Sequence, residues 1–498
     1  MNVNPITRLD YPDLDVIRVE DTYYMVSTTM HFMPGCEILQ SFDLVHWEHV
    51  TYVYETLDHT DAQQLKSGQN IYGQGMWAAS LRYHEGRFYI CFVANDTRKT
   101  YLYTSEKIDG PWKKQLIEGF YHDGSLLFDE DGRNYIVYGN DEIWITELNE
   151  DLTAPKKDGL HRLLVSDHKN PELGYEGSHI QKINGYYYIF LIHSLRDRWM
   201  RTEACFYSDS LEGEFTGGDV LCDDRGYCGQ GVAQGGIVDT PDGKWYAMLF
   251  QDSGAVGRIP ILLPVTWKDH FPVFGQNGHV PEEIEVHSTR PGYIYQPLVG
   301  SDDFCNGLLP RWQFNHDPDP RYYHLDALQG TYTITTREVC TELTQAVNTL
   351  TQRMSYPSCA AEVTVDASAL KEGDVAGLCA LQSCYAAVGI TKHHGKYEVL
   401  MLDKKEDGIL DMTEGTVVES HQMDFRLEAD FCNMKDEARC YYRVNKGDWL
   451  PIGTVHKLYF KLDHFTGCRF GLFCYAAEET GGSACFRDFK YYDVDEIS

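Results

Sequence analysis

The sequence is short of basic residues and of helical patterns. Lysine and arginine together number 43, against 75 aspartates and glutamates, which gives a formal net charge of −32 at pH 7. Such a chain would repel nucleic acids and anionic membrane surfaces, because both are polyanions. We therefore expect no nucleic acid and no membrane as partner, and a neutral ligand fits the charge better.

Targeting and membrane signals are also missing. No run of 18 apolar residues occurs, so the sequence predicts no membrane-spanning helix. The first residues, MNVNPITRLDYPD, lack the basic stretch and apolar run of a secretory signal. The 15 cysteines are scattered and form no CxxC pair, which favours reduced, mostly buried thiols over a disulfide or zinc framework. These features predict a cytoplasmic location.

Several catalytic motifs are absent as well. The chain contains no HExxH, no GxxxxGK[ST] and no GxSxG. The sequence therefore gives no support for a zinc protease, a P-loop nucleotidase or an α/β-hydrolase.

What the chain does have is one hairpin unit that recurs five times. Its clearest copy is HDGSLLFDEDGRNYIVYG at 122–139, an apolar run, a charged turn and an aromatic, β-branched run. The other copies lie at 13–28, 77–93, 176–192 and 234–250. The tyrosines after the five turns are spaced 65, 46, 53 and 58 residues apart. An all-strand unit repeated at this period predicts a five-bladed β-propeller, since a β-sandwich would not repeat one hairpin in this way.

The first strand of each blade should line the propeller axis, so residues that open these strands should meet at one mouth. Counting back 12 residues from each tyrosine, or 11 in the first copy with its shorter turn, gives five axial positions: Asp13, Trp77, Asp123, Glu176 and Gln234. Three of the five are acids, which is the main functional signal. A lone acid before a strand is more often a turn or cap residue, and Asp15 competes with Asp13 because both face the same side.

Five residues are candidates for contact with a ligand: Trp77, Arg258, Gln234, His31 and Phe32. The axial register favours a ligand-facing role for Trp77 over core packing. Arg258 lies in the apolar run GRIPILLP and would be costly to bury without partners, so we expect it to pair with an axial carboxylate or with substrate hydroxyls. His31 and Phe32 lie near the mouth of blade one, where substrate contact and structural filling are equally open.

The pattern changes in the second half of the chain. Residues 280–304 look like a crossover out of the propeller, and from about 305 apolar and polar residues alternate between Gly, Asp and Asn turns without the hairpin repeat. This tail predicts an antiparallel β-sandwich. The expected domains are therefore a propeller at 1–300 and a β-sandwich at 301–498.

Three of these motifs together resemble the family 43 glycoside hydrolases: DYPDLDVIRVEDTYYM (10–25), HDGSLLFDEDGR (122–133) and YEGSHIQKINGYYY (175–188). The tail motifs NTLTQR (348–353) and DVAGL (374–378) resemble the concanavalin-like sandwich attached to many β-xylosidases of that family. The resemblance implies an inverting β-xylosidase or α-L-arabinofuranosidase. It assigns Asp13 as general base, Asp123 as the orienting, pKa-setting aspartate and Glu176 as general acid.

The resemblance also places Trp77 beside the bound sugar and Arg258 on its hydroxyls. Two positions depart from the family pattern: Leu14 replaces the proline that usually follows the base, and Gln234 stands in the stretch where many relatives have a histidine. The second departure leaves a structural calcium ion in doubt. No cofactor is expected for catalysis, and the metal content is left unassigned.

Inversion requires one protonated and one ionised carboxyl group on opposite sides of the sugar. Apolar surroundings raise the pKa of a carboxyl group, so we expect the neighbouring Tyr175 and Tyr187, with an ionised Asp123, to keep Glu176 protonated. The leading hypothesis is an exo-acting β-xylosidase on short xylan-derived oligosaccharides, with α-L-arabinofuranosidase second. A non-catalytic sugar-binding propeller, a retaining fructosidase-type propeller and a homo-oligomer remain open.

Overall fold

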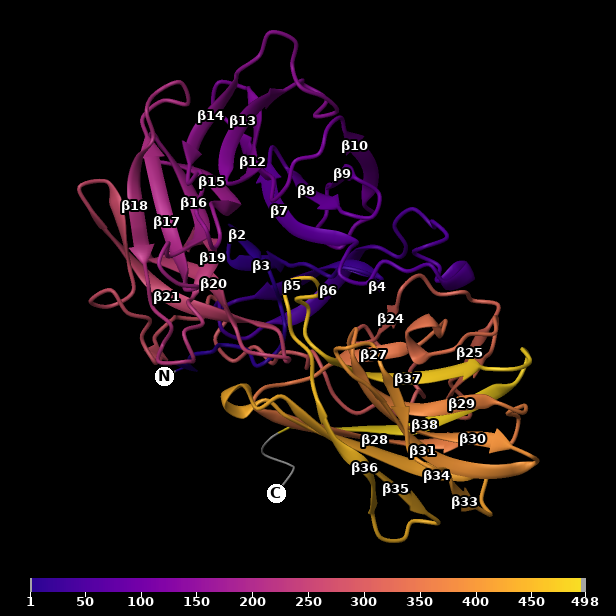
Figure 1. Ribbon diagram of the computed structural model, residues 1–498. Helices are drawn as coiled ribbons and strands as arrows, with labels where there is room; N and C mark the ends of the chain where they lie inside the picture. The colour runs from indigo at the N-terminus through magenta and orange to yellow at the C-terminus, as the bar shows by residue number, and fades with distance from the viewer. Residues whose placement is uncertain (1, 494–498) are drawn as a thin grey trace.

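The structure, a computed structural model, describes residues 2–493 and consists almost wholly of β-strands (Figure 1). Five four-stranded antiparallel sheets are arranged as the blades of a propeller, and two larger sheets form the second half of the molecule. Within 2–493 the only helices are three short 3-10 turns, and none is long and apolar enough to cross a membrane. The all-β propeller-plus-sandwich prediction is confirmed.

Each blade runs outward from an inner strand. The blades, in chain order, comprise β2 (Asp15–Val19), β3 (Thr22–Val26), β5 (Gly35–Ser41) and β6 (Glu48–Tyr54); β7 (Met76–His84), β8 (Arg87–Ala94), β9 (Lys99–Ser105) and β10 (Lys113–Ile117); β11 (Ser125–Phe128), β12 (Asn134–Asn140), β13 (Glu142–Leu148) and β14 (His161–Ser166); β15 (Glu176–Ile183), β16 (Tyr186–Ser194), β17 (Arg201–Ser208) and β18 (Thr216–Leu221); β19 (Ala233–Asp239), β20 (Trp245–Asp252), β21 (Arg258–Lys268) and β22 (Phe271–Phe274).

The hairpins between the first two strands of each blade differ in length. Blades one, two and four turn in two residues, as in the Asn184-Gly185 turn, where both residues have positive φ (50° and 86°). Blades three and five turn in five residues, 129–133 and 240–244. Two-residue turns of this kind match the twist of the flanking strands and are common in tight hairpins.

The tail forms a sandwich of two antiparallel sheets. One contains β32 (Leu410–Met412), β31 (Lys396–Lys404), β30 (Tyr385–His393), β29 (Asp374–Leu381), β37 (Arg469–Ala476), β27 (Leu350–Arg353), β24 (Gln313–Asn315) and β4 (Phe32–Met33), with β33 (Thr416–Val418) beside β31. The other contains β25 (Tyr323–Asp326), β26 (Thr331–Thr335), β38 (Ser483–Asp493), β28 (Ser358–Asp366), β34 (Gln422–Asp430), β35 (Glu437–Val444) and β36 (Leu450–Lys457).

The two halves are joined by shared structure. Strand β4 comes from the first blade yet pairs with β24 of the sandwich, so one sheet contains segments from both halves. The largest buried apolar cluster, mostly sandwich side chains, also includes Ala255, Val256 and Ile259 of blade five. The N-terminal strand β1 (Asn2–Val3) pairs with β23 (Glu283–Ile284) in the crossover segment after the last blade. The sandwich is therefore packed firmly against the propeller.

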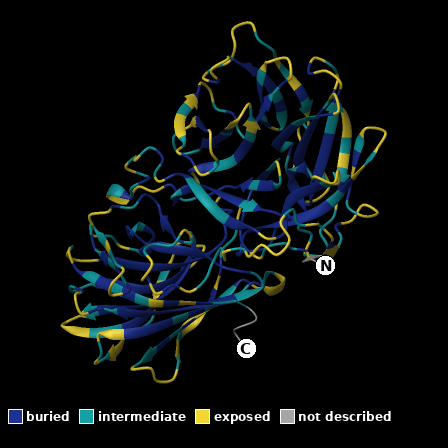
Figure 2. Cartoon of the chain, turned by 180° about the vertical axis from the view of Figure 1, so that it is seen from behind, coloured by how far each residue is buried: buried dark blue, intermediate teal, exposed yellow. Residues whose placement is uncertain are grey.

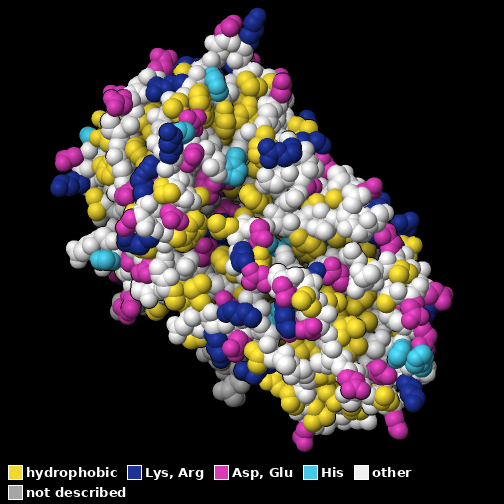
Figure 3. Space-filling model, viewed as in Figure 1, with side chains coloured by type: hydrophobic (Ala, Val, Ile, Leu, Met, Phe, Trp, Pro, Cys, Tyr) yellow, Lys and Arg dark blue, Asp and Glu magenta, His cyan; other side chains and the backbone are white. Residues whose placement is uncertain are grey.

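Burial follows the layered architecture, with the strands largely buried and the loops exposed (Figure 2). All fifteen cysteines are free and nine of them are buried, as the sequence predicted. Acidic and basic side chains are interspersed over the face of the molecule seen in Figure 3.

Candidate active site

The axial residues of the five blades share one backbone conformation. In each blade the tyrosine that follows the hairpin turn pairs with a residue of the inner strand. The axial residue lies four positions before that partner. Each also has a left-handed φ: Asp13 (50°), Ala78 (35°), Asp123 (49°), Gly177 (66°) and Gln234 (63°). Such φ values are uncommon for residues other than glycine and mark a sharp turn of the chain as it enters each inner strand.

This arrangement corrects the predicted register in two blades. Trp77 and Glu176 do not occupy the axial positions but lie one residue before them. The cause is the two-residue hairpin turn of blades two and four, which makes the correct count 11 rather than 12. Consecutive residues of a strand face opposite ways, and the pairing of both strands is interrupted by a bulge at this point. Two of the five equivalent positions are therefore acids, and Glu176 approaches from the adjacent position.

Asp13 is buried at the entrance to β2 and both of its carboxylate oxygens are engaged. Arg258 places Nη1 2.5 Å from Oδ1, and the hydroxyl of Thr28 donates to Oδ2 at 2.6 Å. The same Thr28 oxygen accepts a hydrogen bond from the backbone N–H of Ala78 at 2.9 Å. These contacts hold the carboxylate in one orientation.

Asp15 has a different role, which resolves the competition between the two aspartates. Its Oδ2 accepts hydrogen bonds from Arg82 Nη1 at 2.7 Å and from the backbone N–H of Leu81 at 2.8 Å. The Arg82 guanidinium also donates to the Ser125 hydroxyl and to the Leu126 and Ile180 carbonyls. Arg82 thus connects four blades across the axis and closes the base of the pit.

Asp123 lies in the same axial pit as Asp13. The backbone N–H of Gly177 donates to its Oδ2 at 2.8 Å, and Nε2 of His122 lies 3.6 Å from the same oxygen. Burial raises the pKa of Asp123 to about 6, although the charge of His122 opposes this shift. The carboxylates of Asp123 and Glu176 raise the pKa of His122 to about 9, against the effect of its burial.

Glu176 opens β15 and faces His122 and Asn140. The Asn140 side-chain amide donates to Glu176 Oε2 at 2.8 Å, and His122 Nε2 lies 3.6 Å from that oxygen. Burial raises the pKa of Glu176, but the nearby positive charges of His122, Arg201 and Arg258 outweigh it and leave the pKa below its usual value.

The expectation that apolar surroundings raise this pKa is wrong. Tyr175 packs on His193 and Phe206, and the Tyr187 hydroxyl donates to Asp129 in the neighbouring blade. Both tyrosines point away from Glu176, so its neighbours are polar and charged. In this structure the proton that an acid would need resides on His122, a residue that the sequence reasoning missed although it directly precedes Asp123.

Arg258 is confirmed as the partner of an axial carboxylate. Besides Asp13, it contacts Asp252 through Nε at 3.2 Å, and Asp252 in turn pairs with Arg201 at 2.8 Å. The backbone N–H of Arg258 donates to Asp10 at 2.7 Å. All five side chains are buried. The two arginines therefore surround one side of the pit with positive charge, and this charge also lowers the pKa of Glu176.

The β-sandwich supplies one wall of the pit. Phe465, in the loop between β36 and β37, packs on Trp77 with ring centroids 5.2 Å apart. The Arg258 guanidinium lies over the same phenylalanine ring, 3.9 Å from its centroid. Trp77 is partly exposed and forms an edge contact with His122 at 6.3 Å. Sequence reasoning missed Phe465, because nothing in its local pattern marks it as lying near residues 77 and 258.

His31 and Phe32 lie at the interface between the propeller and the sandwich. His31 is fully buried among aromatic rings, with His316 at 4.7 Å and His464 at 5.3 Å between centroids. The Arg469 guanidinium covers the Phe32 ring at 3.5 Å. Burial lowers the pKa of His31 well below its usual value, so this histidine is neutral. These contacts support structural filling rather than sugar contact for both residues.

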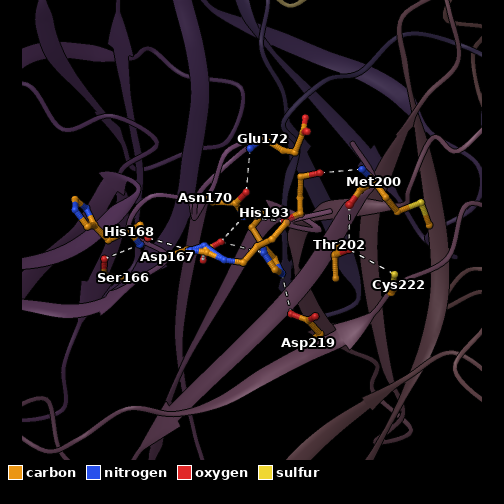
Figure 4. A network of polar contacts seen from close by, with 12 residues as sticks. Ser166, Asp167, His168, Asn170, Glu172, His193, Met200, Thr202, Asp219 and Cys222 are labelled. Carbon is orange, nitrogen blue, oxygen red and sulfur yellow. Dashed lines mark hydrogen bonds and ion pairs between the residues drawn. The ribbon is translucent and has the colours of Figure 1, made fainter. Parts of the chain in front are cut away.

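A polar network fixes the loop that leads into Glu176 (Figure 4). His193 at the end of β16 lies 3.2 Å from Asp167 and 2.8 Å from Asp219. Asn170 donates to Asp167 at 2.7 Å and to the Ser194 carbonyl at 2.8 Å. Burial disfavours a charged His193, but the two carboxylates outweigh it and raise its pKa. The network ties residues 167–170 to blade four and so fixes the approach to β15.

The axial residues do not fit a structural calcium ion well. Calcium binds six to eight oxygen ligands, but one oxygen of Asp13 and one of Asp15 are engaged by arginines, and both ring nitrogens of His179 lie near backbone carbonyls. Gln234 lines this pit, and its backbone N–H donates to Glu203 at 2.7 Å. Within 2–493, one His/Asp/Glu group has ligating atoms within 4.8 Å of one another, namely His122, Asp123 and Glu176. A metal there would occupy Glu176, and we assign none.

A five-bladed propeller with buried carboxylates at its axis is the arrangement expected of a glycoside hydrolase. Comparison with known proteins identifies the family. The profile described as "Glycosyl hydrolases family 43" matches residues 3–272, and that of the "Beta xylosidase C-terminal Concanavalin A-like domain" matches residues 301–492. The chain belongs to glycosyl hydrolase family 43, and the resemblance found in the sequence is confirmed.

Two relatives match most of this chain in sequence, and a solved structure matches all of it in fold. The chain is 26% identical to a protein named "Beta-xylosidase" from Formosa agariphila, over 99% of this chain and 89% of that protein. It is 24% identical to a "Non-reducing end alpha-L-arabinofuranosidase" from Bacteroides ovatus, over 82% of this chain and 79% of that one. A bifunctional GH43-CE structure from Bacteroides eggerthii superposes with a TM-score of 0.91 at 42% identity, covering all of this chain but 64% of that longer protein.

Proposed function

We propose that the chain is an exo-acting, inverting glycosidase that releases terminal β-D-xylose from xylan- or arabinoxylan-derived oligosaccharides, with α-L-arabinofuranose as the second candidate sugar. The observation that carries the proposal is the set of carboxyl groups gathered at the axial pit. Asp13 and Asp123 line this pit, and Arg82 closes its base. Glu176 lies beside the pit, with its Oε2 3.6 Å from Nε2 of His122. A pit closed at one end favours cleavage of the terminal sugar over cleavage within a polymer.

The roles follow from the contacts. Asp13, held in place by Arg258 and Thr28, would activate a water molecule on one face of the sugar. Glu176 would donate a proton to the leaving oxygen on the other face. An inverting pair has its carboxyl groups about 6.5–9.5 Å apart, which leaves room for that water. Trp77, Phe465 and Arg258 would surround the sugar between them.

His122 accounts for how an acid of lowered pKa can still donate a proton. In the unliganded pit the proton resides on His122, beside an ionised Glu176. A sugar that enters the pit displaces water, and the loss of water penalises the charged pair more than the neutral one. The proton would then pass from His122 Nε2 to the Glu176 oxygen 3.6 Å away. Asp123, hydrogen-bonded to the N–H of Gly177, would orient this pair.

The choice between the two pentoses is supported only by the names of relatives, which include both activities. A side-by-side assay on nitrophenyl β-D-xyloside and nitrophenyl α-L-arabinofuranoside ranks them. NMR of the first product tests inversion, because an inverting enzyme releases the anomer opposite to that of the substrate. Retention of configuration would overturn the inverting mechanism. Sugar binding without turnover would favour a non-catalytic propeller.

A further inference from the structure

A second cavity lies at the opposite end of the propeller axis from the catalytic acids. Its volume is about 410 Å³, within the range of about 300–1,000 Å³ that is common for small-molecule sites. The far ends of all five inner strands β2, β7, β11, β15 and β19 line it. Arg82 lines this cavity as well, and its hydrogen bonds across the axis separate the cavity from the catalytic pit.

Aromatic side chains from three blades line this far cavity. Trp245 of blade five is partly exposed, and Tyr83 of blade two is 45% exposed. His84 stacks on Phe128 of blade three, with centroids 4.6 Å apart and planes 9° from parallel. Exposed aromatic faces at the floor of a concave site offer flat, apolar surface to a ring-shaped ligand.

The charges of the far cavity are neutralised within the protein. Arg18 donates to both carboxylate oxygens of Asp239, and Lys182 lies 2.6 Å from Asp129 and 3.1 Å from Glu130. The five guanidinium contacts of Arg82 are all made to protein atoms. A charged ligand would have to break one of these pairs, whereas a neutral ligand need not.

One buried polar atom of the cavity has no partner within residues 2–493. Gln181 of blade four donates its side-chain N–H to the carbonyl of Ile237 at 2.8 Å, which fixes the amide plane. Its Oε1 is buried and accepts no hydrogen bond. An unsatisfied buried acceptor is costly, and a ligand hydroxyl would relieve that cost.

We propose that this far cavity binds a neutral sugar, a pentose or a short xylo-oligosaccharide, at a site independent of the catalytic pit. Trp245 and Tyr83 provide the stacking faces, and Gln181 Oε1 accepts a hydroxyl. The choice of a pentose rests on the proposed function, whereas the neutral, ring-shaped, hydroxylated character of the ligand rests on the cavity alone. Such a site would hold product or a second oligosaccharide without taking part in hydrolysis.

Calorimetric titration of the full-length Glu176→Gln variant with xylobiose tests the site. We expect two binding events per chain, and a single one after the further change Trp245→Ala or Tyr83→Ala. Two separate variants are used because either could disturb folding, which circular dichroism and the thermal midpoint would reveal. Tyr293→Ala is the matched control, because Tyr293 is 39% exposed but lies in the crossover segment, outside the far cavity. In the otherwise native chain, Trp245→Ala and Tyr83→Ala should leave kcat on nitrophenyl pentosides within about twofold, since neither residue lines the catalytic pit.

The outcomes separate this inference from the proposed function. A single event that both far-cavity variants leave unchanged, while Trp77→Ala abolishes it, would overturn the second site and leave the hydrolase proposal standing. The second site would also be overturned if the Tyr293→Ala control lost one of the two binding events, as the far-cavity variants do. Failure of the native chain to hydrolyse any pentoside, with two binding events still present, would instead overturn the proposed function and support the second site.

Discussion

Arg258 and Asp13 form a buried ion pair, with Nη1 and Oδ1 2.5 Å apart, although 245 residues separate them in the chain. The pair connects the first blade to the last and so is part of the closure of the ring. Its partner contacts, Thr28 on Asp13 and Asp252 on Arg258, satisfy other atoms of both groups. A buried pair with such satisfied neighbours fixes a carboxylate in direction, which suits a base that must activate a water molecule.

Asp13→Asn should abolish most activity on every substrate. Asparagine keeps the shape of the side chain but cannot accept a proton, and a proton-transfer role is typically worth about 10²–10⁴-fold in rate. Values of kcat/KM on nitrophenyl xyloside and on xylobiose should fall together by that range. Asp21→Asn, the same change at the turn between β2 and β3, where the acid pairs with Arg290, is the control and should have no effect. Retention of more than a tenth of the activity on both substrates would rule out Asp13 as the base.

Glu176→Gln should lower activity by different amounts on substrates with different leaving groups. Nitrophenolate leaves without protonation, so activity on nitrophenyl substrates should fall less than about tenfold, whereas hydrolysis of xylobiose should fall by about 10²–10⁴-fold. The ratio of the two losses is the measurement. Glutamine can still accept the hydrogen bond that Asn140 now donates to Glu176. Equal losses on both substrates would show that Glu176 does not donate the proton.

His122→Asn should move the basic limb of the pH profile. The kcat/KM profile reports the free enzyme, in which His122, with a pKa of about 9, holds the proton that Glu176 needs. The basic limb of the native chain should therefore fall near pH 9. Without His122, the main cause that lowers the pKa of Glu176 is gone, so the pKa of Glu176 rises. Glu176 must then hold the proton itself, and the proton is lost when the pH passes the pKa of Glu176. The basic limb should shift to lower pH by more than about one unit, and an unchanged limb would exclude the proton-holding role.

Much of the fold could be predicted from the sequence because each blade repeats one hairpin. Tyrosines at the same hairpin position and acids near the strand starts identify the ring and place Asp13, Asp123 and Glu176 at a shared pit. The register failed in blades two and four because the count depended on turn length, and a one-residue slip reverses the face of a strand. The signal was present: Glu85-Gly86 and Asn184-Gly185 are the residue types of two-residue turns.

Other parts of the site could not be found in this way. Phe465 reaches the pit from the sandwich, nearly 400 residues along the chain from Trp77, and only the packing of the two halves brings them together. The surroundings of Glu176 were misjudged because Tyr175 and Tyr187 are its neighbours in sequence or strand but not in space. His122 directly precedes Asp123, and a titratable residue next to a predicted acid is a signal in the sequence that could have indicated it.

Arg82→Met should lower the thermal stability of the protein. The change leaves the buried carboxylate of Asp15 without its partner, and removal of one member of a buried pair costs about 3–5 kcal/mol. The thermal midpoint should fall clearly, as measured by calorimetry. The double variant Arg82→Met/Asp15→Asn should recover part of the loss, because the unpaired charge is then gone. A midpoint unchanged in Arg82→Met would show that the closure of the pit does not depend on this residue.

Phe465→Ala, a change in the β-sandwich, should weaken catalysis in the propeller. The ring packs on Trp77 and lies under the Arg258 guanidinium, so its removal opens one wall of the pit and frees the arginine that holds Asp13. A cation–π contact is worth about 0.5–2 kcal/mol, so kcat/KM should fall by about 2- to 30-fold. Leu462→Ala, in the same loop but 47% exposed, is the matched control and should leave kcat/KM unchanged. Phe465→Tyr should retain most of the activity, because the ring face is kept. If Phe465→Ala and Leu462→Ala behave alike, the sandwich does not complete the catalytic pit, and its contribution is limited to packing against the propeller.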